Sequence, residues 1–107
     1  MRTKSYKDLL AYQKSYEVVR LIYGLTADFP SSEMYGLVSQ MRRAAISVPA
    51  NISEGYRRGS QKEYVQFLKI GLGSNAELET ELCLSRDLGF MEESKFKEIY
   101  ALNEEVG

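Results

Sequence analysis

Tyr35–Ser60 has the sequence YGLVSQMRRAAISVPANISEGYRRGS, and this stretch decides the fold because its pattern predicts one long helix with two different faces. Its apolar side chains recur every three or four residues, which places one stripe along a helix: Val38, Met41, Ala45, Val48 and Ile52. The opposite face carries a polar line of similar spacing: Gln40, Arg43, Ser47, Asn51, Glu54 and Arg58. Pro49 removes a backbone donor and crowds the carbonyl of Ala45, so a kink is expected in the middle of this helix.

The residues before this stretch predict a first helix. Ser5 and Asp8 have the spacing of a capping box. Two adjacent apolar stripes follow, one with Leu9, Tyr12, Tyr16, Val19 and Tyr23, the other with Ala11, Val18, Ile22 and Leu25. Two stripes indicate contacts with more than one neighbour, as in a bundle or an oligomer. The Phe29–Pro30 pair ends the pattern, because the residue before a proline avoids helical angles.

The long second helix is expected to begin near Ser32 or Glu33 and to end near Arg58, where Gly59 is well placed as a C-terminal stop. Ser60 then starts a capping box that opens a third helix. The apolar face of this third helix contains Tyr64, Phe67, Leu68, Gly71, Leu78 and Leu82.

Three residues of the third helix are unusual for their positions. Asn75 is a polar side chain on the core face, and such a residue can fix register or partner choice. Gly71 and Gly73 are unfavourable inside a helix, so we expect them to let a neighbouring helix approach closely. Gly89 ends the helix, and a fourth begins near Glu92. The short apolar face of the fourth helix contains Phe96, Ile99, Tyr100 and Leu102.

These elements predict an all-α fold. Strand-like alternation, hairpin dipeptides and internal repeats are all absent from the sequence. Four helices with short connections are typical of an antiparallel up-down four-helix bundle. We therefore expect residues 1–107 to form one such domain, with its second helix kinked at Pro49.

Charge is unevenly distributed, although the formal total is only −1. Residues 1–70 contain 11 Lys and Arg against 6 Asp and Glu, a net charge of +5, and residues 71–107 contain 3 against 9, a net charge of −6. Such asymmetry can steer a polyanion to one side, or pair the two halves within or between subunits. The single cysteine and the lack of a signal-like or membrane-spanning apolar run indicate a soluble cytoplasmic protein with no membrane partner.

The sequence lacks the residues of common catalytic and metal sites. It has no histidine, so the usual general base and the commonest transition-metal ligand are missing. Cys83 therefore has no histidine that could activate its thiol as a nucleophile. Glu77, Glu79 and Glu81 are two residues apart, so they fan around the helix and are expected to form an acidic solvated face. We expect no enzyme, no metal site and no cofactor.

Two interpretations of the charged residues stay open. In one, a basic surface contacts RNA phosphates or a protein partner through Arg42, Arg57, Arg58 and Lys62, with Tyr56 and Tyr64 able to stack on bases. In the other, a polar network holds helices or subunits in register through Arg43, Ser47, Asn51, Glu54 and Glu77. Arg43 and Glu54 are three turns apart, so they cannot pair within one helix.

Several motifs resemble those of a known family. They are Tyr12-Gln13-Lys14-Ser15, Phe29-Pro30, Tyr35-Gly36-Leu37-x-Ser39-Gln40-x-Arg42-Arg43-Ala44, Ser47-x-Pro49-Ala50-Asn51-Ile52-x-Glu54-Gly55 and Gly73-Ser74-x-Ala76-Glu77-Leu78-Glu79. Over nearly the whole chain they resemble the four-helix bundle family that includes the 23S ribosomal RNA intervening-sequence proteins. The most specific part of the resemblance is the segment from Arg42 to Gly55.

The resemblance implies an antiparallel four-helix bundle that assembles as a homopentamer, a ring with a central channel, and no known catalytic activity. The accessory variability protein of diversity-generating retroelements is similar to this fold, and it is a basic pentamer that binds nucleic acid and a reverse transcriptase. The expectation is therefore a non-enzymatic oligomeric bundle that binds RNA or protein. The alternative is a homopentameric scaffold directed purely at protein, without nucleic-acid binding.

Overall fold

Four α-helices and two short 3₁₀ turns make up the structure, a computed structural model that describes residues 5–107. The helices are α1 (Leu10–Thr26), α2 (Leu37–Arg57), α3 (Gln61–Asp87) and α4 (Glu93–Val106), and the turns are η1 (Tyr6–Asp8) and η2 (Ser31–Glu33). Residues 5–107 contain no strand, so the predicted all-α four-helix class is confirmed. The predicted domain extends over residues 1–107, of which residues 1–4 lie outside the described part.

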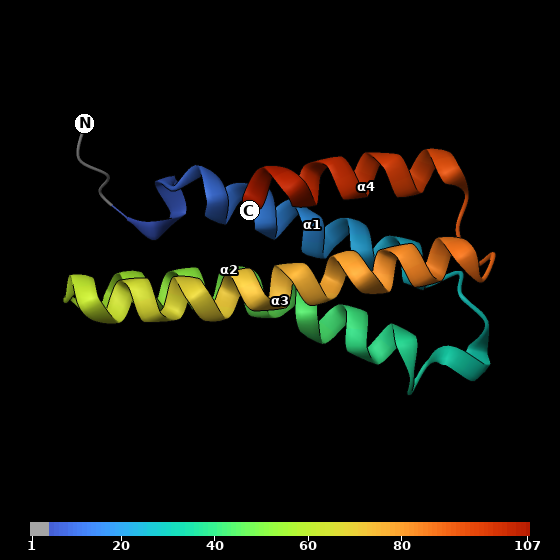
Figure 1. Cartoon of the computed structure of the whole chain (residues 1–107), viewed down its shortest axis with the longest axis horizontal. Helices are drawn as coiled ribbons and strands as arrows, with labels where there is room; N and C mark the ends of the chain where they lie inside the picture. The colour runs from blue at the N-terminus through green and yellow to red at the C-terminus, as the bar shows by residue number, and fades with distance from the viewer. Residues whose placement is uncertain (1–4) are drawn as a thin grey trace.

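Contacts between successive helices show that neighbours run antiparallel. Ser74 of α3 donates a 2.7 Å hydrogen bond to Ser47 of α2, whereas Ser85, later in α3, lies beside Met41, earlier in α2. α4 packs against α3 and α1, and α1 packs against α2, which closes the bundle. Figure 1 shows the chain running back and forth along the long axis of the molecule.

α2 begins later than the sequence pattern predicts. The preceding residues form η2, and Gly36 has a non-helical backbone, so the helix starts at Leu37 instead of near Ser32 or Glu33. It then continues through Pro49 without interruption. The kink predicted at this proline stays a prediction.

The other helix ends follow the predicted signals. Gly59 and Gly89 have φ angles of +81° and +80°, in the left-handed region that favours glycine, directly after α2 and α3. Ser60 Oγ accepts a 3.1 Å hydrogen bond from the backbone N–H of Glu63, as expected of a capping box. Ser5 caps η1, and not the α-helix that follows.

Apolar side chains from all four helices form one core. The stripe predicted in α2 is buried over its whole length. It shares one core with buried side chains from the other three helices: Val18, Ile22, Leu78, Leu82, Phe96 and Ile99. Burial of this stripe fixes the rotation of α2 about its axis. The polar line on its opposite side is therefore directed toward α3 and the surface.

Of the glycines, the one packed most tightly against a neighbouring helix is one that the sequence analysis did not single out. A Cβ atom at Gly55 of α2 would lie only 2.7 Å from Cβ of Phe67 in α3, so these helices meet there. Gly71 also faces α2, at ordinary van der Waals distance. Gly73 is exposed with nothing within 4 Å of its Cβ position, so the expectation that it permits close approach is wrong.

α4 covers only part of the bundle. Figure 1 shows it ending partway along α3, whose N-terminal half continues past it. Asn75 holds α4 against α3, because its side-chain Nδ2 donates a 2.9 Å hydrogen bond to Oδ1 of Asn103 in α4. Both asparagines are buried, which explains the polar residue on the core face of α3. Within residues 5–107 no helix has the length and apolarity needed to cross a membrane.

Candidate functional site

The middle of the polar line forms a hydrogen-bonded chain between α2 and α3. Asn51 Nδ2 donates to the backbone carbonyl of Ser47 at 2.7 Å and to Ser47 Oγ at 2.9 Å. Ser47 Oγ in turn accepts a 2.7 Å hydrogen bond from Ser74 of α3. This chain lies within one turn of Pro49, whose missing N–H leaves the helix one backbone hydrogen bond short. It links the weakened turn of α2 to the neighbouring helix.

The charged residues of the predicted network do not take part in this series of hydrogen bonds. Arg43 and Glu77 are exposed, and neither has an ion pair among the described residues. Glu54 pairs with Arg58 one turn later in the same helix, at 3.1 Å. Among the described residues, Arg43 and Glu77 therefore remain available to a partner outside the chain, whereas Glu54 is already paired with Arg58. Their role in a subunit interface stays a prediction.

The predicted basic contacts fall into two separate places. Arg42 and Arg57 are fifteen residues apart in α2, which is about 22 Å along a helix axis. Arg42 Nε donates a 3.0 Å hydrogen bond to Thr26 Oγ1, and its guanidinium lies 4.5 Å from the ring centre of Tyr23. Arg42 thus joins α2 to α1, and much of its binding capacity is used within the chain.

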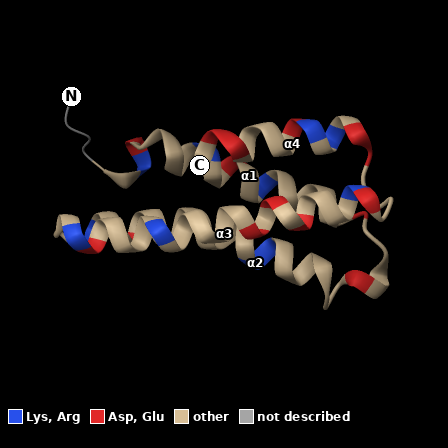
Figure 2. Ribbon diagram, viewed as in Figure 1, with Lys and Arg blue, Asp and Glu red and all other residues tan. Residues whose placement is uncertain are grey.

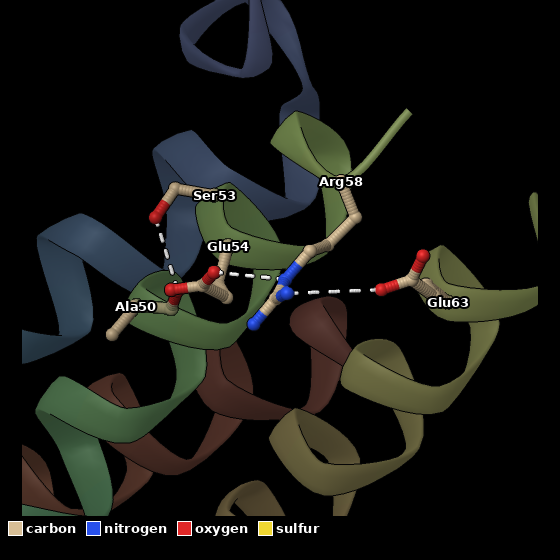
Figure 3. Close-up of polar contacts among 5 residues, drawn as sticks. All are labelled: Ala50, Ser53, Glu54, Arg58 and Glu63. Atoms are coloured by element: carbon tan, nitrogen blue, oxygen red, sulfur yellow. Dashed lines mark hydrogen bonds and ion pairs between the residues drawn. The ribbon is translucent and has the colours of Figure 1, made fainter. Parts of the chain in front are cut away.

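The other basic candidates lie at the end of the bundle where α2 passes to α3. Arg58 contacts two carboxylates, Glu54 at 3.1 Å and Glu63 at 3.8 Å, and Figure 3 shows its guanidinium between them. Arg57 and Lys62 are exposed and have no ion pair among the described residues. Of this cluster, Arg57 and Lys62 are therefore the cations that remain for an outside anion.

A more extensive surface runs over α1 and α2, and we call it the α1–α2 face. It is formed by five large apolar or aromatic side chains that are all exposed: Tyr16, Tyr23, Met34, Tyr35 and Ile46. Tyr35 is 97% exposed. Two shallow grooves of about 610 and 280 Å³ cross this face, and their linings include Arg20, Arg42 and Arg43 but no carboxylate.

The sequence contained a signal for this face that the predicted contact residues did not use. Tyr16 and Tyr23 belong to the apolar stripe of the first helix that starts at Leu9, one of two adjacent stripes that indicated contacts with more than one neighbour. Within the described bundle, α1 contacts α2 and α4 and leaves these two tyrosines exposed. Tyr35 and Ile46 extend the same surface onto the region of α2. Among the described residues, no helix covers this surface.

The comparison with protein families agrees with this architecture. The family model described as 23S rRNA-intervening sequence protein matches residues 7–107, nearly the whole chain. This chain belongs to the 23S rRNA-intervening sequence protein family. The comparison with curated proteins found no match.

The family's name denotes no reaction. The described residues of this member contain few groups of the kind that catalysis uses. Residues 5–107 contain no group of three or more potential metal-ligating side chains. Cys83 of α3 has a free, half-buried thiol. The sequence contains no histidine that could act as its general base. Figure 2 shows acidic residues along α4 and the C-terminal half of α3, while basic residues mark the other end of α3.

One carboxylate of this family member departs from the predicted solvated acidic face. Glu81 of α3 is buried with 5% of its surface exposed, and its Oε1 has no hydrogen-bond partner. Burial, and secondarily the charge of Glu77 one turn earlier, raise the pKa of Glu81 to about 7. The expectation of an exposed glutamate at this position is wrong, because residue 81 lies on the turn of α3 that follows the inward-facing Leu78.

Proposed function

We propose that this protein is a non-enzymatic, self-associating helical bundle of the cytoplasm, and that the α1–α2 face is its subunit interface. The observation that carries the proposal is the row of exposed large side chains on this face. Aromatic and methionine side chains are enriched at protein interfaces, and a contiguous exposed apolar patch rimmed by polar groups is typical of an association site. By family resemblance the assembly has five subunits.

A ring of five requires two different surfaces on each subunit, because a two-fold contact closes as a dimer. The α1–α2 face supplies one surface, with arginines and no carboxylates in its groove linings. The exposed side of α3 offers a complementary one, where Leu84 and Leu88 are exposed and Asp87 lies between them. Opposite charge on the two halves of the sequence supports this head-to-tail pairing.

Replacing Ile46 with glutamate tests the interface. Ile46 is exposed in the single chain, so Ile46→Glu should leave the fold intact while it replaces an apolar contact at the centre of the interface by a charged side chain that must lose its water. We expect light scattering to give about 61 kDa for the natural chain, five times 12.2 kDa, and the dissociation constant of the variant to rise at least tenfold.

Leu10→Glu is the matched control, because Leu10 is an exposed apolar residue of α1 outside the α1–α2 face. It should assemble as the natural chain does. A natural chain that is monomeric at tens of micromolar would contradict the proposal. If the Ile46→Glu variant assembles as tightly as the natural chain, the α1–α2 face is not the subunit interface.

RNA binding is a second candidate function, supported by the aromatic cluster beside Arg57. The rings of Tyr6, Tyr56 and Tyr64 lie in edge contacts, with centroid separations of 6.4 and 6.1 Å around Tyr56. The Arg57 guanidinium lies 5.5 Å from the ring centre of Tyr6. Exposed cations beside aromatic rings are the combination that binds phosphates and stacks on bases.

A salt titration with a structured RNA hairpin tests this second candidate. If the cluster binds RNA, affinity should fall steeply between about 50 and 200 mM salt, and the double change Arg57→Ala with Lys62→Ala should make the salt slope shallower by about two. Lys97→Ala, an exposed lysine of α4, is the control and should leave the slope unchanged. Absence of binding at about 50 mM salt would exclude this candidate and leave the protein-directed scaffold.

A further inference from the structure

The groove linings of the α1–α2 face contain three arginines, and two of them are already engaged within the chain. Arg20 forms a 3.1 Å ion pair with Glu17, three residues earlier in α1. The Arg42 side chain bonds to Thr26 and lies over a tyrosine ring. Arg43 is exposed and has no ion pair among the described residues. It is therefore the arginine of this face that an outside carboxylate can bind.

A second exposed stripe runs along α3, and we call it the α3 stripe. Its apolar members are the exposed side chains of Ile70, Leu84 and Leu88. Glu77, which is also exposed, lies seven residues from both Ile70 and Leu84, so these three side chains share one side of the helix. The α3 stripe therefore places a carboxylate between exposed aliphatic side chains, a pattern suited to contact with an equally mixed surface.

The carboxylates of this part of α3 differ in whether they are paired. Asp87 forms a 3.0 Å ion pair with Arg86. Glu77 has no ion pair among the described residues, and neither has the buried Glu81 one turn later. Two carboxylates four residues apart in a helix repel each other, so a cation beside Glu77 would lower the free energy of both. The α3 stripe therefore favours the approach of a cation at Glu77.

The α1–α2 face and the α2–α3 contact border each other along α2. Ser47 lines a groove of the α1–α2 face, and the same hydroxyl accepts the hydrogen bond from Ser74 of α3. Ser74 lies three residues before Glu77, so the α3 stripe is next to this contact. Two neighbouring surfaces, unlike two opposite ones, turn each subunit relative to the one before it. Such a turn allows a head-to-tail series of subunits to close into a ring.

We propose that Arg43 of one subunit forms an ion pair with Glu77 of the next subunit, while Ile46 packs against the aliphatic members of the α3 stripe. The inference rests on the proposed self-association through the α1–α2 face, and it names the contact that sets the register of that association. Ile46 follows Arg43 by three residues, so the apolar contact lies beside the ion pair and shields it from water. A shielded pair contributes more to specificity than one in full contact with solvent.

Charge reversal tests the pair. Arg43→Glu and Glu77→Arg each place like charges together at every subunit contact, so light scattering should show the dissociation constant rising at least tenfold for each variant. The double variant, Arg43→Glu with Glu77→Arg, forms the pair with its charges exchanged and should assemble to within about threefold of the natural chain. Lys97→Glu and Glu104→Arg are the matched controls, because they make the same charge changes at exposed positions of α4. They should leave assembly unchanged.

Mixing the two single variants distinguishes a contact between subunits from one within a chain. In an equimolar mixture each variant supplies the charge that the other lacks, so mixed assemblies should form although each variant alone associates poorly. Native mass spectrometry resolves the two chains by their masses. Restored assembly in the double variant but not in the mixture would place the pair within one chain and overturn the proposal. A single variant, either Arg43→Glu or Glu77→Arg, that assembles as the natural chain does would also overturn it.

The Ile46→Glu variant keeps this test separate from the test of the proposed function. A natural chain that is monomeric, or whose assembly Ile46→Glu leaves unchanged, would contradict the proposed interface and the ion pair with it. Assembly that is weakened by Ile46→Glu but unaffected by Arg43→Glu and Glu77→Arg would support the interface and overturn the ion pair alone.

Discussion

The Gly55→Ala substitution should lower the free energy of unfolding by about 1–2 kcal/mol, although alanine is the better helix former. The new methyl group would lie 2.7 Å from Cβ of Phe67 and 3.2 Å from the backbone carbonyl oxygen of Tyr64. Neither atom can rotate away, so α2 and α3 must separate. Overpacking of this kind costs about 1–3 kcal/mol, which offsets and exceeds the helix propensity gained from alanine.

Gly73→Ala is the matched control for this prediction. Gly73 is also an interior helical glycine, but nothing lies within 4 Å of its Cβ position. We expect this variant to gain up to about 1 kcal/mol, so the two substitutions should have opposite signs. Urea unfolding followed by circular dichroism measures both. A stabilised Gly55→Ala variant would mean that α2 and α3 are more loosely packed than the structure indicates.

Sequence periodicity predicted the four helices because each one buries a regular apolar stripe. It placed the α2 stripe correctly, since every member of that stripe is buried. It did not identify the tight glycine, because Gly55, Gly71 and Gly73 all have helical neighbours and only the rotation of α2 against α3 distinguishes them. Asn75 was recognisable as unusual, but its partner Asn103 belongs to another helix, which local sequence cannot indicate.

The candidate site was less predictable, because the sequence shows how many charged residues each half contains but not which of them are already paired within the fold. Arg42 and Arg58 contribute to the basic half of the sequence, yet one is stacked on Tyr23 and the other contacts two carboxylates. Tyr16 and Tyr23 were part of a predicted stripe of the first helix, whereas Tyr35 and Ile46 belonged to no predicted stripe. An apolar stripe in the sequence does not indicate which element will pack against it. In the single chain, the side chains of the α1–α2 face are exposed.

Glu81 should make the protein less stable as the pH rises from 5 to 8. Its pKa is about 7 in the folded chain, above the 4.5 of an ordinary glutamate, so the folded state holds more protons between these values. Stability therefore falls as the pH rises through this window, and the penalty is complete above pH 7. A difference of about 2.5 pKa units corresponds to roughly 3 kcal/mol. Histidine, which normally titrates in this range, is absent from the sequence.

Glu81→Leu should remove this pH dependence and raise the free energy of unfolding at pH 8 by about 2–3 kcal/mol. Leucine is similar in size to glutamate and has no oxygen atom that would be buried without a hydrogen-bond partner, as Oε1 of Glu81 is. At pH 5 the gain should be much smaller, since Glu81 is then largely protonated. Glu77→Gln is the control, because Glu77 is exposed and contributes only the secondary, electrostatic part of the shift. It should reduce the pH slope slightly. Urea unfolding at several pH values measures all three chains, and an equal gain from Glu81→Leu at pH 5 and pH 8 would show that the carboxyl group stays ionised in the fold.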